Sequence, residues 1–224
     1  MARFGMFKFG TKKFGIEPVN QRLSWIFEVD WNGDGLFDGN NDALKMFYIE
    51  VERGRLLWLA NTGGGFEPIM TGKLSVDLLD VERKYDPYNI NSPFYGNLVQ
   101  GRCFRLRVKR ESDGTIINIM AGRIERVRPN YGENVSRVKI TAVDDSVLIK
   151  KKTISSGVYT SKRYDSAIEV CLTAAGFSNY SIDTTVSDAM PYWWASGRSA
   201  YAEIASLTDA VLGMFYFAAD GTPT

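Results

Sequence analysis

Alternation of apolar and polar residues dominates the first two thirds of the chain and predicts β-strands. In the segment 102–110, RCFRLRVKR, Phe104, Leu106 and Val108 face one way, and the residues between them are basic. A period of two residues is typical of a strand with one buried face. Similar segments, or segments rich in β-branched and aromatic residues, occur at 22–31, 44–54, 72–80, 115–129 and 135–143. With turns between them, they predict antiparallel strands that form a β-barrel or sandwich.

The pattern changes after Tyr164, where apolar residues recur at helical spacing. Asp165 is the expected N-cap of one helix and Gly176 its stop, and Ser199 is the expected N-cap of a second. A short strand is predicted near 180–183, and MFYFAADG at 214–221 predicts a strand that enters a turn. Because the chain would end in mid-hairpin, we expect a fragment or a strand supplied by a partner.

The first fifteen residues contain a short repeat that fits neither helix nor strand. Phe4, Phe9 and Phe14, each followed by glycine, recur every five residues. We interpret this as an extended arm whose phenylalanines are interface residues, docking on a neighbouring subunit or folding back. The predicted division is therefore an arm (1–21), an antiparallel β-barrel (22–150) and a small α/β domain (151–224).

Composition excludes several classes of function. With 27 basic and 26 acidic residues, the net charge of +1 gives no reason to expect nucleic acid or stable membrane insertion. The absence of histidine removes Ser-His-Asp and Cys-His nucleophile pairs and His-based zinc sites. Cys103 and Cys171 are too few for a disulfide framework and are expected to be buried free thiols, with a single bridge as the alternative. We therefore expect no enzyme and no required cofactor.

The stretch 30–42, DWNGDGLFDGNND, is the one candidate for metal binding. Its first five ligand positions match a calcium loop, with Gly35 where the sharp turn is required, but the final bidentate glutamate is missing. The alternative is a hairpin turn built from Asn, Asp and Gly. If Ca²⁺ binds, the expected ligands are Asp30, Asn32, Asp34, the Leu36 carbonyl, Asp38 and Asn41.

Three other groups of residues have a functional interpretation and, beside it, a simpler structural one. The basic row on 102–110 could contact phosphate, although such rows are more often solvated or at interfaces. Aromatic residues at 192–194 could stack on a sugar, although such clusters more often belong to a core or interface. Paired carboxylates could act as in glycosidases, although capping or solvated carboxylates are commoner. These aromatic residues and carboxylates are Tyr192, Trp193 and Trp194, and Asp77, Asp80, Asp144 and Asp145.

Several of these segments, in their order along the chain, resemble a known family. They are the Phe-Gly repeat, VDWNGDG, ERKYDPYNINSPFYGNLVQGR at 82–102, AGRIERVRP with VKITAVDD, and WWASGRSAYAEIASLTDAVLGMFYFAADG at 193–221. Together they resemble the N-terminal half of hub proteins at the tail tip or baseplate of long-tailed bacteriophages. The resemblance implies a tail-tube-like antiparallel β-barrel with a small α/β insertion. It also implies trimers whose two barrels per subunit form a pseudo-sixfold ring, although this chain is too short to contain the second barrel.

The expected function is therefore that of a structural virion protein, joining tail tube to tip through subunit assembly. Expected partners are further copies, as a trimer, and other tail proteins such as the tube, the distal ring or the spike. One alternative is a calcium-stabilised carbohydrate-binding module, monomeric, with the aromatic residues at 192–194 as its platform. A cell-wall glycosidase that uses two carboxylates is the other alternative.

Overall fold

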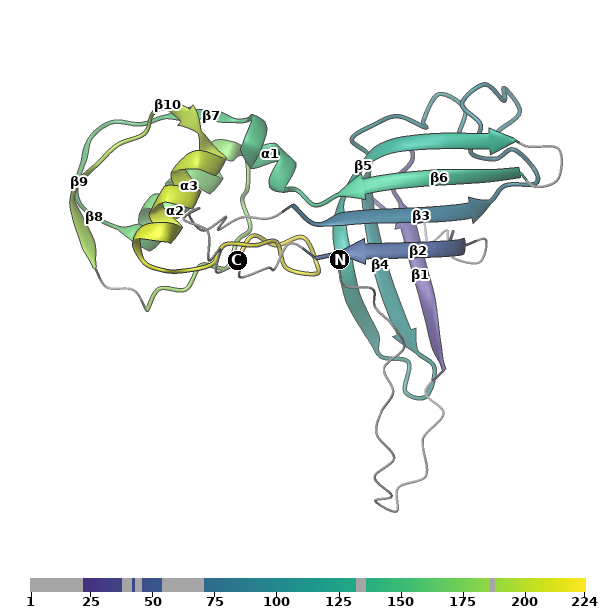
Figure 1. The fold of residues 1–224 in the computed structure, drawn as a ribbon, viewed down its shortest axis with the longest axis horizontal. Helices are drawn as coiled ribbons and strands as arrows, with labels where there is room; N and C mark the ends of the chain where they lie inside the picture. Colours follow the sequence, from purple (N-terminus) through teal and green to yellow (C-terminus); the bar gives the residue numbers. More distant parts are fainter. Residues whose placement is uncertain (1–21, 38–41, 43–45, 54–70, 132–135, 186–187) are drawn as a thin grey trace, which may run out of the picture.

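The computed structural model describes residues 22–37, 42, 46–53, 71–131, 136–185 and 188–224. Figure 1 shows a six-stranded sheet beside a smaller part that contains three helices and two two-stranded sheets. The fold is mainly antiparallel β with few helices, as the sequence pattern predicts. Within the described residues, no helix combines the length and apolar character needed to cross a bilayer.

All neighbouring strands of the large sheet are antiparallel, in the order β1-β4-β5-β6-β3-β2. Each of them lies close to a predicted strand. Their bounds are β1 Leu23–Val29, β2 Met46–Glu52, β3 Lys73–Leu79, β4 Cys103–Arg110, β5 Ile116–Tyr131 and β6 Ser136–Val143.

The long strand β5 makes the sheet curl into a half-barrel (Figure 1). Its first half pairs with β4 and its second half with β6, and both ladders contain a register shift. Such irregularities bend a strand and increase its twist. At the bend, a Cβ on Gly122 would lie 2.1 Å from the carbonyl oxygen of Val143, so only glycine fits there.

The concave side of the half-barrel holds the first hydrophobic core. The alternating residues of β3, β4 and β6 point into it, as the period of two predicts. Fully buried side chains include Phe27, Phe104, Leu106, Val76 and Ile140. Burial of this apolar surface is the main force that holds the curled sheet together.

A second core lies in the smaller part and is built mainly from two helices. Its elements are α1 Ser146–Lys151, β7 Thr153–Ser155, β8 Tyr159–Arg163, α2 Tyr164–Ala175, β9 Ala189–Trp193, β10 Ser196–Ser199 and α3 Ala200–Ala210. Apolar residues of α2 and α3, among them Cys171, Leu172 and Ile204, are fully buried. Ile149 in α1 belongs to this core.

Capping explains where the two longer helices begin and end. Gly176 ends α2 in the left-handed conformation, and the Ser199 hydroxyl accepts the backbone N–H of Ala202 at the start of α3, both as predicted. Asp165 is not the N-cap of α2, because it lies inside the first turn and pairs with Arg163, the N-cap residue. The predicted strand at 180–183 does not form.

The C-terminal hairpin is paired within the chain. Tyr216 and Thr224 exchange two backbone hydrogen bonds, and the N–H of Ala218 bonds to the carbonyl of Thr222. The expectation that another chain supplies the second strand of this hairpin is therefore wrong.

Candidate functional site

The acidic turn that follows β1 is held together by its own side chains. The buried carboxylate of Asp30 accepts the backbone N–H of Gly33 at 2.7 Å and that of Gly35 at 3.0 Å. Both glycines have positive φ angles, which other residues adopt only with strain. The turn therefore forms through Asx-type hydrogen bonds to the Asp30 carboxylate.

The next predicted metal ligands also have partners inside the turn. Asp34 accepts the side-chain amide of Asn32 at 2.9 Å and the backbone N–H of Leu36 at 2.8 Å. Asp38 and Asn41 lie outside the described residues, as do Phe4, Phe9 and Phe14. In the described part of the chain, no group of three or more His, Cys, Asp or Glu residues is placed to hold a metal ion. Calcium binding remains a prediction.

Trp31 anchors the acidic turn to the loop between β3 and β4. Its ring centroid lies 5.9 Å from that of Tyr85 and 5.3 Å from that of Phe94, and the latter two rings are 5.6 Å apart. Tilted rings at these separations contribute about 0.5–1.5 kcal/mol per pair beyond their buried area. The segments VDWNGDG and ERKYDPYNINSPFYGNLVQGR thus meet at one end of the sheet.

Asp42 adds a buried polar contact to this aromatic cluster. Its carboxylate accepts a short hydrogen bond from the Tyr85 hydroxyl, while Lys84 Nζ and Trp31 Nε1 each lie 3.4 Å away. Asp42 is only 4% exposed, so these partners replace the water that the charged group has lost. The sequence pattern gave this residue no role beyond lying one position beyond the expected last metal ligand.

Asp80 fixes the other end of the same loop. Its fully buried carboxylate accepts the backbone N–H groups of Lys84 at 2.7 Å and Tyr85 at 3.1 Å, and the Tyr131 hydroxyl at 3.0 Å. Arg83 takes a left-handed conformation here and stacks its guanidinium on the Tyr131 ring at 4.7 Å. Asp80 therefore holds the loop in place, which is a structural use of the carboxylate.

Between these anchors the loop runs as a series of overlapping turns. Every third backbone N–H donates to the carbonyl three residues earlier, at 3.0–3.4 Å, in Arg83, Asp86, Asn89, Ser92 and Tyr95. Side chains reinforce the turns, because Asn89 donates to the carbonyl of Arg83 and the Ser92 hydroxyl donates to that of Lys84. Hydrogen bonds hold the backbone of this loop along most of its length, although the loop contains no helix or strand.

Burial and neighbouring charge keep the two tyrosines of this site protonated. Burial, followed by the charge of Asp42 and the hydrogen bond to it, raises the pKa of Tyr85 far above its ordinary value. Burial and the hydrogen bond to Asp80 raise the pKa of Tyr131 in the same way. Both hydroxyls are thus hydrogen-bond donors at neutral pH, which suits a structural network better than proton transfer.

The basic row on β4 is paired within the protein. Arg105 makes two hydrogen bonds to the Glu28 carboxylate, at 2.7 and 3.1 Å, and Arg107 bonds to the same carboxylate. Burial raises the pKa of Glu28, but the two arginines together lower it by more. The net result is a pKa below the usual value. Arg105 and Arg107 therefore neutralise a buried carboxylate on β1. Lys109 pairs with Glu111 and Arg110 with Asp113, so the row does not form a free phosphate-binding stripe.

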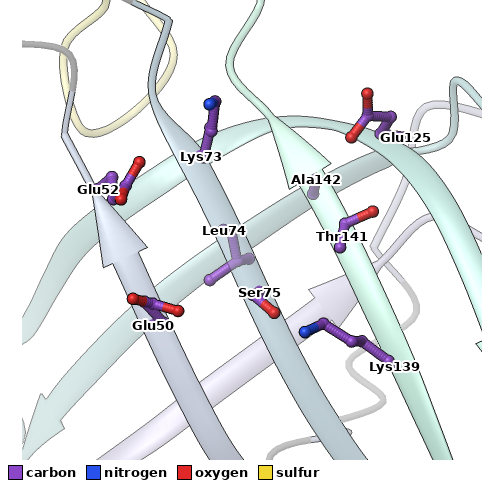
Figure 2. Close-up of a pocket in the computed structure, with 9 residues that line it drawn as sticks. All are labelled: Glu50, Glu52, Lys73, Leu74, Ser75, Glu125, Lys139, Thr141 and Ala142. Atoms are coloured by element: carbon purple, nitrogen blue, oxygen red, sulfur yellow. The ribbon is translucent and has the colours of Figure 1, made fainter.

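Charged side chains also line a groove on the outer face of β2, β3 and β6. Figure 2 shows a groove with Glu50 and Glu52 on one side, Lys73 and Ser75 on β3, and Lys139 and Thr141 on β6. Among the described residues, none of these charged side chains forms an ion pair. Glu125 lies at the far border of the groove (Figure 2). This arrangement offers charges to a partner but no cluster suited to catalysis.

The three neighbouring aromatic residues do not form one platform. Trp193 is buried and stacks on Tyr159, with ring centroids 5.6 Å apart. Tyr192 and Trp194 are 66% and 53% exposed. Tyr192 and Trp193 are successive residues of β9, so their side chains point to opposite faces and cannot share one platform.

The remaining candidate groups also have structural roles. The Asp144 carboxylate accepts the backbone N–H groups of Gly72 at 2.6 Å and Ser146 at 3.1 Å, and Asp145 pairs with Arg123 at 2.9 Å. Cys103 and Cys171 are free thiols, and burial raises the pKa of Cys171 to about 12. A thiol with so high a pKa is a poor nucleophile.

Comparison with known proteins finds this fold in two solved tail proteins. A 43 kDa tail protein of prophage MuSo2 from Shewanella oneidensis matches with a TM-score of 0.60 and 11% identity, over 90% of this chain and 52% of that one. A tail protein from Neisseria meningitidis MC58 matches with a TM-score of 0.53 and 10% identity, over 89% of this chain and 49% of that one. This chain thus spans about half the length of either protein.

At these identities the likeness shows a shared fold. No protein-family model matches the chain, and no curated protein matches it in sequence.

Proposed function

We propose that this chain is a structural subunit of a phage-type tail, located in the virion at the tail tip or baseplate hub. There it would join the tail tube to the tip. The observation that carries the proposal is the fold shared with two tail proteins over 90% and 89% of this chain. The resemblance of residues 82–102 to hub proteins supports the position at the tip.

The site chemistry supports a structural role. The carboxylates at the end of the sheet bind backbone N–H groups, hydroxyl groups and a lysine of the same chain. They shape two loops and hold them together. A structural subunit of this kind acts through binding and turns over no substrate.

The proposed assembly is a homotrimer that also contacts other tail proteins, such as the tube, a distal ring or the spike. Large apolar side chains that are well exposed, including Phe47, Tyr88 and Ile90, favour contacts with partners. The charged groove of Figure 2 provides a second face whose charges lack ion-pair partners among the described residues.

Immunogold electron microscopy of particles from the source cells tests this function. Antibodies against the chain should label the distal end of the tails, and particles assembled without the gene should carry no label. A label on the head or along the whole tail would contradict the hub position. Absence of the chain from purified particles, measured by mass spectrometry, would contradict a role in the virion.

A further inference from the structure

The loop between β3 and β4 exposes large apolar side chains at one end of the sheet. Val81, Tyr88 and Ile90 are 82%, 87% and 73% exposed, and Tyr95 and Val99 are 53% and 46% exposed. We call these five side chains the turn-loop surface. The five side chains belong to one loop, and exposed apolar surface of this kind is a common feature of protein–protein contact sites.

The turn-loop surface is held in place before any partner binds. The overlapping turns, the buried carboxylate of Asp80 and the packing of Tyr85 and Phe94 on Trp31 fix the backbone beneath it. Binding to an ordered surface avoids the entropy cost of folding a loop during association. This combination of exposed apolar side chains and a fixed backbone is typical of a docking surface.

The chain itself contains a segment with matching chemistry. Residues 1–21 hold Phe4, Phe9 and Phe14 together with four basic residues and one acidic residue. The described residues around the turn-loop surface, 30–37, 42 and 80–102, hold six carboxylates and three basic side chains. Phenylalanines match the apolar side chains, and the opposite net charges favour their encounter.

The position of β1 gives this segment access to another copy. Leu23, at the start of β1, pairs with Arg110, whereas Val29, at its end, pairs with Phe104 and leads into the acidic turn. The segment therefore joins the sheet at the end of β1 opposite the acidic turn, about one strand length, or roughly 20 Å, from that turn. Twenty-one residues can reach about 70 Å when extended, which is enough to reach a neighbouring molecule as well as the chain's own turn-loop surface.

We propose that the phenylalanine-lysine arm, residues 1–21, binds the turn-loop surface of a neighbouring copy of this chain. Such a contact joins two different surfaces and can therefore close a ring of identical subunits. The inference rests on the proposed function in one respect, because a ring requires the multimer proposed there. It adds the segment and the surface that hold the copies together.

Photo-crosslinking of the full chain tests this contact. Phe9 is replaced by p-benzoylphenylalanine, and isotopically heavy and light chains are mixed before irradiation. The expected product is a heavy-light crosslink between residue 9 and a peptide within 80–101. A crosslink within one chain, a crosslink to any other segment, or no crosslink would overturn the proposal.

Two variants keep the result specific. Ile90→Ser with Tyr88→Ser should lower the crosslink yield about tenfold or more, because each removes apolar contact area. Val158→Ser removes a side chain that is 67% exposed in the smaller part and should leave the yield unchanged. Equal losses in both variants would overturn the assignment of the surface. Antibody labelling of tails without the crosslink would overturn this inference and leave the proposed function standing.

Discussion

Replacing Tyr85 by phenylalanine removes the shortest contact to the buried carboxylate of Asp42. The hydroxyl of Tyr85 is the close donor, and the other two donors, Lys84 Nζ and Trp31 Nε1, lie 3.4 Å away. A hydrogen bond to a charged group contributes about 1.5–3 kcal/mol. Because the phenyl ring still fills the aromatic cluster, we expect Tyr85→Phe to lower the free energy of unfolding by about 2 kcal/mol.

Urea unfolding followed by circular dichroism and tryptophan fluorescence measures this change. Tyr192→Phe is the matched control, because Tyr192 is 66% exposed, lies outside the turn-loop surface and should shift the free energy of unfolding by less than about 0.5 kcal/mol. A double-mutant cycle with Asp42→Asn should return a coupling of about 1 kcal/mol or more. If Tyr85→Phe behaves like Tyr192→Phe, Asp42 does not anchor the acidic turn through Tyr85.

The pH dependence gives a second reading of the same contact. The pKa of Tyr85 is raised in the folded protein above its ordinary value of 10.0, so its stabilising contribution is complete below pH 10 and is lost above it. Between neutral pH and pH 11, the free energy of unfolding of the wild type should fall by about 1.4 kcal/mol more than that of Tyr85→Phe. Equal losses would contradict the burial of this hydroxyl.

Three further predictions concern the sheet and the acidic turn. Glu28→Gln should lower the free energy of unfolding by about 2 kcal/mol at pH 7, because it leaves Arg105 and Arg107 unpaired. Since the pKa of Glu28 is lowered in the folded protein, this contribution is present above the ordinary value of 4.5 and is lost on acidification below it. Acid titration of the stability of both proteins measures this loss. Gly122→Ala should cost about 3 kcal/mol in urea unfolding, because its Cβ would meet backbone atoms at 2.1 and 2.7 Å, whereas Gly157→Ala, with no atom within 4 Å, should be nearly neutral. If the acidic turn binds Ca²⁺ with a dissociation constant of about 1 mM, 10 mM Ca²⁺ should stabilise the wild type by about 1.4 kcal/mol and Asp30→Ala by much less; equal thermal shifts in both would contradict the metal site.

Local pattern predicted β3, β4 and β6 because one face of each is buried. The alternation in β4 predicts Phe104, Leu106 and Val108 in the core, and all three are buried. Contacts between residues far apart in the sequence could not be predicted in this way. Alternation with Phe27 and Val29 places Glu28 on the outer face of β1, yet it is buried because strand pairing places it opposite Arg105, which lies 77 residues away.

The candidate site shows the same division between local and distant information. The residues of the acidic turn were recognisable from their spacing, which suits both a metal loop and a hydrogen-bonded turn. Its contact with the turn-rich loop was not, because Asp42 and Tyr85 are 43 residues apart and neither belongs to a periodic segment. The segment ERKYDPYNINSPFYGNLVQGR nevertheless drew attention to the second loop, because it resembles the hub proteins.

The helical part was predicted only where caps and apolar spacing agree. Gly176 and Ser199 marked the ends that they occupy in α2 and α3. The six-residue helix α1 offered too few turns for a periodic signal. The strand expected at 180–183 does not form, although the N–H of Ser181 bonds to the carbonyl of Pro223. That single contact joins residues 42 positions apart, so local sequence does not reveal it.

The solution mass of the full chain, measured by light scattering over a range of concentrations, tests most directly whether it is an assembly subunit. The account predicts a species of three times the 25.1 kDa of one chain, or a larger ring, and its dissociation in the Ile90→Ser, Tyr88→Ser variant. A single mass of 25.1 kDa at every concentration would contradict self-assembly as the basis of its function.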